Sequence, residues 1–259
     1  MTSPSLPEKT LQVGRLQVEV YADREKMGVA AAYAVAKRMK NIITDSGEVA
    51  MVFAAAPSQN EFLATLRSLD GIAWDKVIAF HMDEYIGLTA DAPQGFGNFL
   101  REHLFESVEP GSVHYLDGQA SDPTEECERY AALLEAHPVD IVCAGIGENG
   151  HLAFNDPAVA DFADPEKVKV VQLDETCRMQ QVHDDCFPDF DSVPTHALTM
   201  SIPALMAARW IYTVVPGPTK AQAIKATLTG LIGTHCPATA LRQHPNSILY
   251  IDRDSASLL

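Results

Sequence analysis

The chain has 259 residues, of which 47% are hydrophobic, so it is long enough to bury the core of one large α/β domain. It carries 19 basic and 35 acidic residues, a formal net charge of −16. A surface this negative repels phosphate backbones and anionic lipid, which excludes nucleic acid and membranes as expected partners, and an anionic small substrate would need a local basic or amide-lined pocket.

The N-terminal segment, Met1 to Gln12, is polar, contains prolines and lacks the apolar core of a signal peptide. No run approaches the ~20 apolar residues of a transmembrane helix. The five cysteines are an odd number without a signal sequence, which predicts reduced thiols and a cytoplasmic location. Cys177, His183 and Cys186 invite comparison with a zinc site, but no fourth ligand has a familiar spacing, so no metal is expected.

Strand and helix patterns alternate along the chain. The predicted strands are Leu16–Tyr21, Val49–Ala55, Val77–Phe80, Val139–Ala144, Val168–Leu173, Trp210–Val215 and Ser247–Ile251. The predicted helices cover about 23–40 (with Asp23 as N-cap), 59–69, 97–106, 122–136 and 219–229.

Continuous apolar strands separated by helices predict a Rossmann-like, mostly parallel sheet with helices on both faces, in a single domain over residues 1–259. Segment 156–195 is acidic, contains four prolines and is the least regular part. It is interpreted either as a lid-like cover over a site or as a long surface excursion.

The most informative stretch is the glycine-rich turn 145–157, which follows the buried strand that ends at Ala144. It presents Asn149, His151, Asn155 and Asp156 at the carboxyl end of that strand, where sites form in open α/β sheets. A histidine flanked by amide and carboxylate groups is suited to proton transfer near neutral pH. The Gly-x-Gly-x-x-Gly spacing alone is a weak dinucleotide signal, and no long amphipathic helix follows it.

Asp83 and Glu84 come directly after the strand at 77–80. Paired acids at a strand end are usually solvated turn residues. Here Met82 and Tyr85 flank them and would restrict solvent, which raises a carboxylate pKa toward that of a useful base. From this segment alone, a catalytic and a solvated role are both open.

Four segments resemble the glucosamine-6-phosphate deaminase/isomerase family, in the right order over about residues 50–255. They are the aspartate motif at 80–88, the histidine loop at 145–157, the lysine segment at 216–221 and the C-terminal signature at 236–246. Related sugar-phosphate lactonases share the fold but typically carry Arg where this chain has Tyr85.

The resemblance implies conversion of an amino sugar phosphate, such as glucosamine 6-phosphate, to a ketose phosphate and ammonia. It implies that His151 assists ring opening and that Asp83 moves the proton from C2 to C1, without cofactor or metal. It further assigns catalytic support to Asn149 and Asp156, and substrate contacts to a second set: Glu84, Gly147 and Lys220. A homo-oligomer is a possible assembly.

Three departures from the family pattern bear on the site. Asn149 stands where part of the family has Asp, and Asp156 stands where Glu is usual. The glycine-rich phosphate loop is replaced by residues 57–62, and a later phosphate-binding Arg falls near Val182. Ser58-x-x-Glu61 is a capping-box pattern, so the loop is either only a helix start or a site where Ser58, Gln59 and Asn60 meet the substrate.

Two other functions compete with the deaminase interpretation. The first is a lactonase of the same fold, against which Tyr85 argues. The second is a non-catalytic sugar-binding regulator, against which Asp83 and His151 argue, because a binding module has no need of an acid–base pair.

Overall fold

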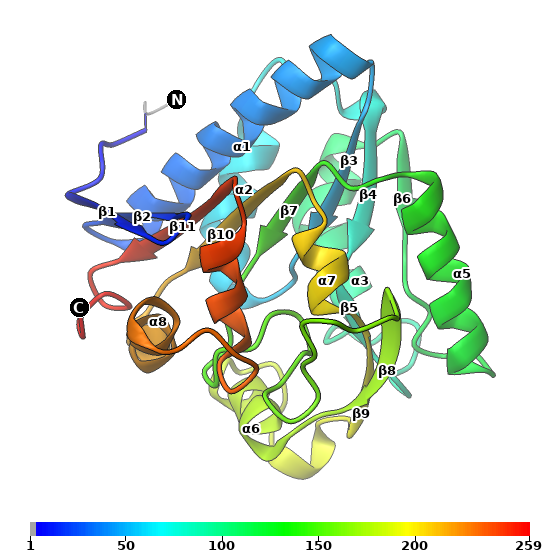
Figure 1. Cartoon of the computed structure of the whole chain (residues 1–259). Helices are drawn as coiled ribbons and strands as arrows, with labels where there is room; N and C mark the ends of the chain where they lie inside the picture. Colours follow the sequence, from blue (N-terminus) through cyan, green and yellow to red (C-terminus); the bar gives the residue numbers. More distant parts are fainter. Residues whose placement is uncertain (1–3) are drawn as a thin grey trace.

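A computed structural model describes residues 4–259 and contains two β-sheets surrounded by helices (Figure 1). The main sheet has eight strands in the order β1-β2-β11-β10-β7-β3-β4-β6, and all neighbours except β1 and β2 are parallel. Its strands are β1 (Lys9–Val13), β2 (Leu16–Tyr21), β3 (Val49–Phe53), β4 (Val77–His81), β6 (Ser112–His114), β7 (Ile141–Ala144), β10 (Trp210–Val215) and β11 (Ser247–Asp252).

Helices cover both faces of this sheet because consecutive strand residues point to opposite sides. On one face, alternate residues such as Met51 and Phe53 pack against α1 (Arg24–Ser46), α2 (Asn60–Ser68) and the helical run 96–108. That run comprises α3 (Phe96–Leu100), a π-helical turn (Arg101–Phe105) and α4 (Glu106–Val108).

On the other face, Ala50 and Val52 belong to a second core with α5 (Pro123–Ala136), α7 (Ile202–Met206) and α8 (Ala221–Thr229). Short 3₁₀ turns complete the connections, at Pro57–Gln59, Trp74–Lys76, Phe190–Ser192, Pro218–Lys220 and Pro237–Gln243. The two cores confirm the predicted α/β class, with a mostly parallel sheet between two helical layers.

Local signals explain where the long helix α1 begins and ends. The Asp23 side chain accepts a hydrogen bond from the Lys26 backbone N–H at 2.8 Å, as an N-cap does, and confirms the predicted start. The helix continues to Ser46, past the predicted end near residue 40, and stops at Gly47 in the left-handed region. Among residues 4–259, no helix is long and apolar enough to cross a membrane.

A second, three-stranded antiparallel sheet lies beside the carboxyl ends of the main strands (Figure 1). It contains β5 (Asp83–Tyr85), β9 (His196–Met200) and β8 (Val168–Gln172) in the order β5-β9-β8. The chain leaves the main sheet at Met82 and enters this sheet at Asp83, which pairs with Thr199. Of its strands, only β8 was expected from the sequence.

The polar N-terminal segment forms a strand that the sequence did not predict, since β1 pairs with β2 around Gly14. One local prediction is wrong. The capping box at Ser58-x-x-Glu61 does not form, since α2 begins without a side-chain cap bond. Glu61 instead forms an ion pair with Arg24 of α1, with 2.7 Å between Oε1 and Nε.

A tight backbone contact at Gly118 holds the loop after β6 against β5. A Cβ atom at this position would lie 1.9 Å from the Tyr85 carbonyl oxygen. Gly118→Ala is therefore expected to destabilise the fold by roughly 1–3 kcal/mol, the range for overpacking. Urea denaturation would measure this, with Ser121→Ala at an exposed position of the same loop as control; equal stability of the two variants would contradict the contact.

Candidate active site

A pocket opens at the carboxyl ends of the four central strands β10, β7, β3 and β4. The chain runs from β3 toward one edge of the sheet and from β7 toward the other, so the pocket lies at the topological switch point where ligands bind in such sheets. Gly147 lines this pocket together with seven polar side chains, which are Ser58, Gln59, Asp83, His151, Gln180, Gln181 and Lys220.

Asp83 is the first residue of β5 and reaches the pocket because the chain turns out of the main sheet just before it. Its side chain is buried, with 7% of the residue exposed. Burial raises the pKa of this carboxyl well above its usual value, and the neighbouring charge of Glu84 adds to the effect. A carboxylate in this state binds a proton readily, as a general base must.

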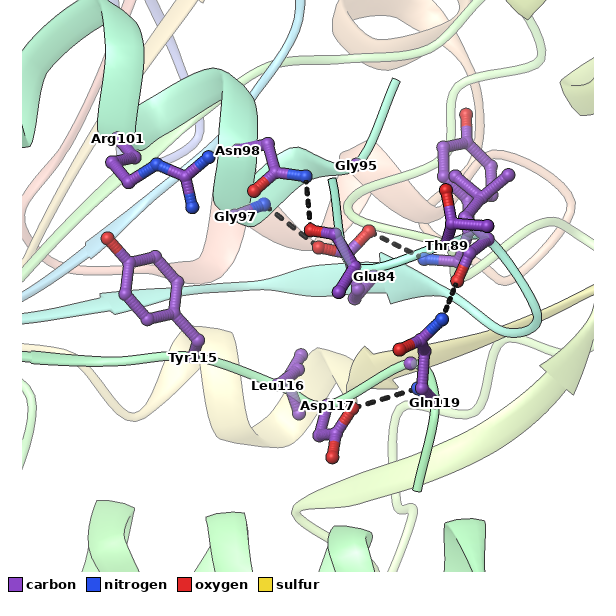
Figure 2. A pocket seen from close by; sticks show the side chains of 14 residues that line it. Glu84, Thr89, Gly95, Gly97, Asn98, Arg101, Tyr115, Leu116, Asp117 and Gln119 are labelled. Carbon is purple, nitrogen blue, oxygen red and sulfur yellow. Dashed lines mark hydrogen bonds between the residues drawn. The ribbon is translucent and has the colours of Figure 1, made fainter. Parts of the chain in front are cut away.

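Glu84 faces the other way, because successive strand residues point to opposite faces. Its carboxylate accepts hydrogen bonds from the backbone N–H groups of Tyr85 (2.9 Å), Phe96 (3.0 Å) and Gly97 (2.9 Å). Burial raises the pKa of Glu84, against the lowering effect of these three bonds. It lines a neighbouring pocket with Arg101 and others (Figure 2).

Two residues predicted to contact substrate therefore lie outside the Asp83 pocket. Glu84 anchors the start of α3 and so positions Phe96, which is part of the pocket wall. Asn60 is exposed at the start of α2 and does not line the pocket.

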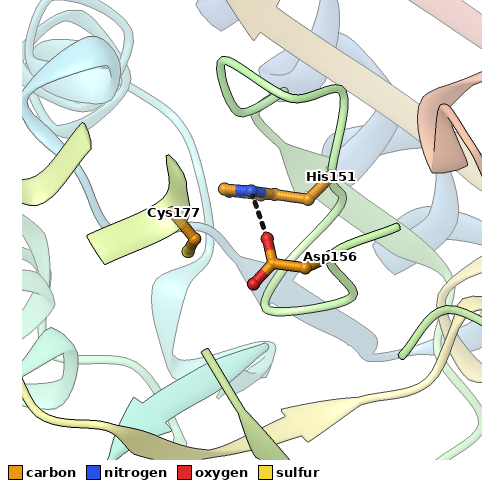
Figure 3. A group of neighbouring side chains, drawn as sticks. All are labelled: His151, Asp156 and Cys177. Carbon is orange, nitrogen blue, oxygen red and sulfur yellow. Dashed lines mark ion pairs between the residues drawn. The ribbon is translucent and has the colours of Figure 1, made fainter. Parts of the chain in front are cut away.

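His151 lines the pocket from the glycine-rich turn after β7. Its Nδ1 lies 3.0 Å from Oδ1 of Asp156 (Figure 3). The imidazole packs directly on Gly147, where a Cβ atom would come within 2.1–2.4 Å of three ring atoms. Only glycine leaves room for this ring position, so the turn sequence itself sets where the imidazole lies.

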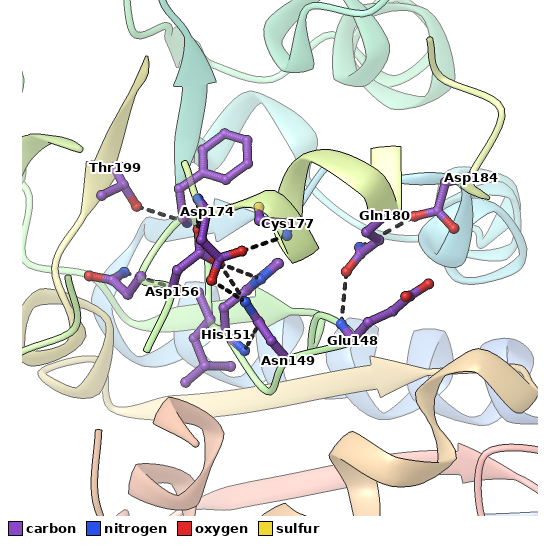
Figure 4. A network of polar contacts seen from close by, with 12 residues as sticks. Glu148, Asn149, His151, Asp156, Asp174, Cys177, Gln180, Asp184 and Thr199 are labelled. Carbon is purple, nitrogen blue, oxygen red and sulfur yellow. Dashed lines mark hydrogen bonds and ion pairs between the residues drawn. The ribbon is translucent and has the colours of Figure 1, made fainter. Parts of the chain in front are cut away.

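Asp156 is fully buried and joins the histidine loop to the segment that follows it (Figure 4). Asn149 Nδ2 donates to its Oδ1 at 2.9 Å, and the Asp174 backbone N–H donates to its Oδ2 at 3.2 Å. Burial alone would raise the pKa of Asp156, but the bonds from His151, Asn149 and Asp174 hold it below the usual value. The carboxylate thus stays ionised beside the imidazole.

Asn149 supports the loop rather than the imidazole ring. Its Oδ1 accepts the His151 backbone N–H at 3.0 Å, and its Nδ2 also donates to Asp174 at 3.1 Å. The residue in contact with the imidazole ring is Asp156, so Asn149 supports the site only through the loop backbone and the two carboxylates.

Within residues 4–259, one group brings three different metal-ligand atoms together: His151, Asp156 and Cys177 lie within 4.8 Å of one another (Figure 3). Burial raises the pKa of the Cys177 thiol well above its usual value, and the charges of Asp156 and Asp174 raise it further. A metal would have to displace that thiol proton and the existing imidazole–carboxylate contact.

Lys220 brings a positive charge to the pocket from the turn after β10. The residue is 4% exposed, and its Nζ has no hydrogen-bond partner within the described part of the chain. Burial lowers the pKa of Lys220, while the charges of Asp184 and Glu148 raise it. An ammonium group with unused donors is suited to an oxygen-rich ligand.

Two glutamines of the site were not predicted. Gln180 and Gln181 lie on α6 (Glu175–His183), inside the segment interpreted as a lid or surface excursion. Gln180 Oε1 accepts the Glu148 backbone N–H at 2.8 Å, which fixes α6 to the histidine loop. No local pattern marks these residues, because only tertiary packing brings them to the pocket.

Comparison with known proteins identifies the family to which this chain is similar. The family model described as glucosamine-6-phosphate isomerases/6-phosphogluconolactonase matches residues 22–250. A glucosamine-6-phosphate deaminase of Bacillus cytotoxicus is 33% identical over 243 residues, which cover 94% of this chain and 89% of that protein. One of Bacillus thuringiensis is 38% identical over 183 residues, 71% and 68% of the two chains.

Solved structures agree with these sequence matches. The structure of a monomeric glucosamine-6-phosphate deaminase matches with a TM-score of 0.85 and 29% identity, over 93% of this chain and 99% of that one. A 6-phosphogluconolactonase from Shewanella baltica shares the fold, with a TM-score of 0.75 at 16% identity over 96% and 99% of the chains. The chain therefore belongs to the glucosamine-6-phosphate isomerase/6-phosphogluconolactonase family.

Proposed function

We propose that this protein isomerises and deaminates an amino sugar phosphate, converting glucosamine 6-phosphate and water to fructose 6-phosphate and ammonia. The observation that carries the proposal is that a buried carboxyl, Asp83, and the His151 imidazole line one pocket, with Asp156 in contact with that imidazole. The relatives named glucosamine-6-phosphate deaminase support it.

In this reaction His151 assists opening of the sugar ring, with Asp156 stabilising the imidazole when it carries a proton. Asp83 then removes the proton from C2, the electron pair forms the C1–C2 double bond, and the C1 carbonyl oxygen takes up a proton, which gives an enolamine with a hydroxyl at C1. Return of the proton to C1 gives an aldose–ketose shift and leaves an imine at C2. Water adds to the imine, and ammonia leaves. No redox cofactor or metal is required by these steps.

The lactonase alternative would open a ring ester with water and release no ammonia. Tyr85 argues against it: the ring is buried and packs at 4.8 Å from Phe96 and 5.2 Å from Phe154 between ring centroids. An aromatic cluster therefore occupies the position where the related lactonases typically carry Arg. Parallel assays of ammonia release and lactone hydrolysis would separate the two activities.

Three further expectations belong to the proposal. α6 acts as a cover over the substrate, since Gln180 and Gln181 line the pocket from outside the main sheet. A cytoplasmic location is supported by five cysteines that are all free. The substrate contacts are assigned to Ser58, Gln59, Gly147 and Lys220.

Asp83→Asn keeps the shape of the side chain and removes the base. Turnover should fall at least ~10²-fold, the lower range for loss of a positioned acid–base group. Because the base must be deprotonated, wild-type kcat/KM should rise with pH through a pKa above that of an ordinary carboxyl. Asp91→Asn at an exposed position is the control, and an Asp83→Asn enzyme with more than half of wild-type turnover would contradict the role.

Gly147→Ala introduces a methyl group into the space that the His151 ring occupies. Turnover of the ring-closed sugar should fall at least ~10²-fold, as in His151→Gln, while an open-chain analogue should lose much less. Gly47→Ala, at the end of α1 with no atom near the added methyl, should leave kcat unchanged. Equal losses on closed and open substrates would argue against a role in ring opening.

Lys220→Ala removes the buried ammonium group. The KM for glucosamine 6-phosphate should rise more than about tenfold, and that for glucosamine far less, because a hydrogen bond to a charged group contributes more than a neutral one. Lys225→Ala, an exposed lysine on α8, is the matched control. A wild-type enzyme that turns over both sugars equally well would refute recognition of the phosphate by Lys220.

A further inference from the structure

The orientation of the Gln59 side chain is fixed by its neighbours. Gln59 is 1% exposed in the 3₁₀ turn after β3, and its Nε2 donates to the Val214 carbonyl oxygen and to Ser58 Oγ, both at 3.1 Å. A carbonyl oxygen only accepts hydrogen bonds, so the amide nitrogen must face β10. Gly145 closes the same side, because a Cβ atom there would lie 3.3 Å from Nε2.

The other end of this amide is a buried acceptor that no described residue satisfies. Gln59 Oε1 has no hydrogen-bond partner anywhere in residues 4–259. Lys220 lines the same pocket, and its buried Nζ donor also has no hydrogen-bond partner among residues 4–259. Buried polar groups are normally paired, so both point to a ligand that offers a donor and an acceptor together.

The ionised form of a phosphate ester does not meet this requirement. A phosphate dianion offers acceptor atoms only, and it would set its oxygens against Oε1 of Gln59. In addition, the negative charges of Asp184 and Glu148 already balance part of the positive charge of Lys220. A hydroxyl group fits better, because it donates to Gln59 Oε1 and accepts from Lys220 Nζ.

We propose that Gln59 makes this end of the pocket selective for a hydroxyl group that donates a hydrogen bond. The hydroxyl belongs either to the sugar itself or to the P–OH of a singly ionised phosphate ester. The inference rests on the proposed function, in that an amino sugar is taken to occupy this pocket. It adds a specificity-determining residue where the family's glycine-rich phosphate loop is absent.

The test compares three ligands by calorimetry with Asp83→Asn protein, which binds without turnover: glucosamine, glucosamine 6-phosphate and glucosamine 6-sulfate. The phosphate ester loses its second proton near pH ~6, so its affinity relative to glucosamine should fall about tenfold per pH unit above that value. Both sugars carry the amino group, so its titration cancels in the ratio of the two affinities. The sulfate ester is a monoanion without a proton and should bind at least about tenfold more weakly than the phosphate ester at pH 5.5.

The sulfate ester also separates this effect from titration of the protein. Lys220, Asp184, Glu148 and Cys177 face the same region, and loss of the lysine proton would weaken both esters alike. A pH dependence confined to the phosphate ester supports the inference. Equal pH dependence of both esters, equal affinity of both at pH 5.5, or no binding by any ligand overturns it.

The Gln59→Ala variant supplies a second measurement, the affinity for glucosamine 6-phosphate and its pH dependence. A purely structural role of Gln59 would not make this affinity higher. Loss of the acceptor should tighten binding of glucosamine 6-phosphate at pH 7.5 by at least about threefold and flatten its pH dependence. Asn60→Ala, at the exposed next position, should match the parent protein. Thermal unfolding checks the fold, because the Val214 carbonyl loses its donor; if the variant does not fold, the three-ligand series alone decides.

The two sources of the hydroxyl are distinguished by the same data. Glucosamine binding more tightly than the phosphate ester at both pH values identifies the sugar hydroxyl, and it would also contradict the phosphate recognition predicted above for Lys220. Tighter binding of the ester at pH 5.5 identifies its P–OH and agrees with that prediction. Failure of the proposed function is a separate result: wild-type protein would then release no ammonia from either sugar, whatever the order of binding.

Discussion

The buried carboxylate of Asp156 is the contact on which the rest of the site depends. It holds the His151 imidazole, the Asn149 amide and the Asp174 backbone N–H at once. Asp174 in turn caps α6, since its Oδ1 accepts the Cys177 backbone N–H at 2.7 Å. One ion, kept charged by its donors, therefore links the histidine loop to the helix that forms the outer wall of the pocket.

The neighbouring acids Asp83 and Glu84 have different roles, one in the pocket and one in holding the fold. A strand turns neighbouring side chains to opposite faces, so one carboxyl reaches the pocket and the other reaches the backbone of α3. Both are buried, and burial raises the pKa of each. The two carboxyl groups differ in their surroundings rather than in their chemistry: within residues 4–259 no hydrogen bond reaches the Asp83 carboxyl, whereas three N–H groups bind that of Glu84.

The sequence predicted the parts that local patterns determine. Apolar runs such as 77–80 and 210–215, and the cap at Asp23, depend on residues close to one another in the chain. The same reasoning placed Asp83 and His151 at strand ends, the family resemblance added Lys220, and the structure brings the three side chains into one pocket.

The parts that the sequence did not predict depend on distant partners. β5 is three residues long and exists only because β9 pairs with it. Glu61 has two possible partners, its own helix start and Arg24, and only the packing of α1 against α2 decides between them. Gln180 and Gln181 reach the pocket through the fold of segment 156–195, which has no strong periodicity of its own.

The pairing of β5 with β9 also has a consequence for the order of folding. Asp83 faces Thr199, and the Thr199 hydroxyl accepts the Phe154 backbone N–H at 3.0 Å, so three distant segments meet at one residue. Closing such long loops costs chain entropy before any contact compensates for it. A nascent chain that has emerged only as far as β7 already contains Asp83 and, soon afterwards, His151. It cannot fix both in place until residue 199 has been synthesised, so we infer that the site is completed late, after much of the central sheet has formed.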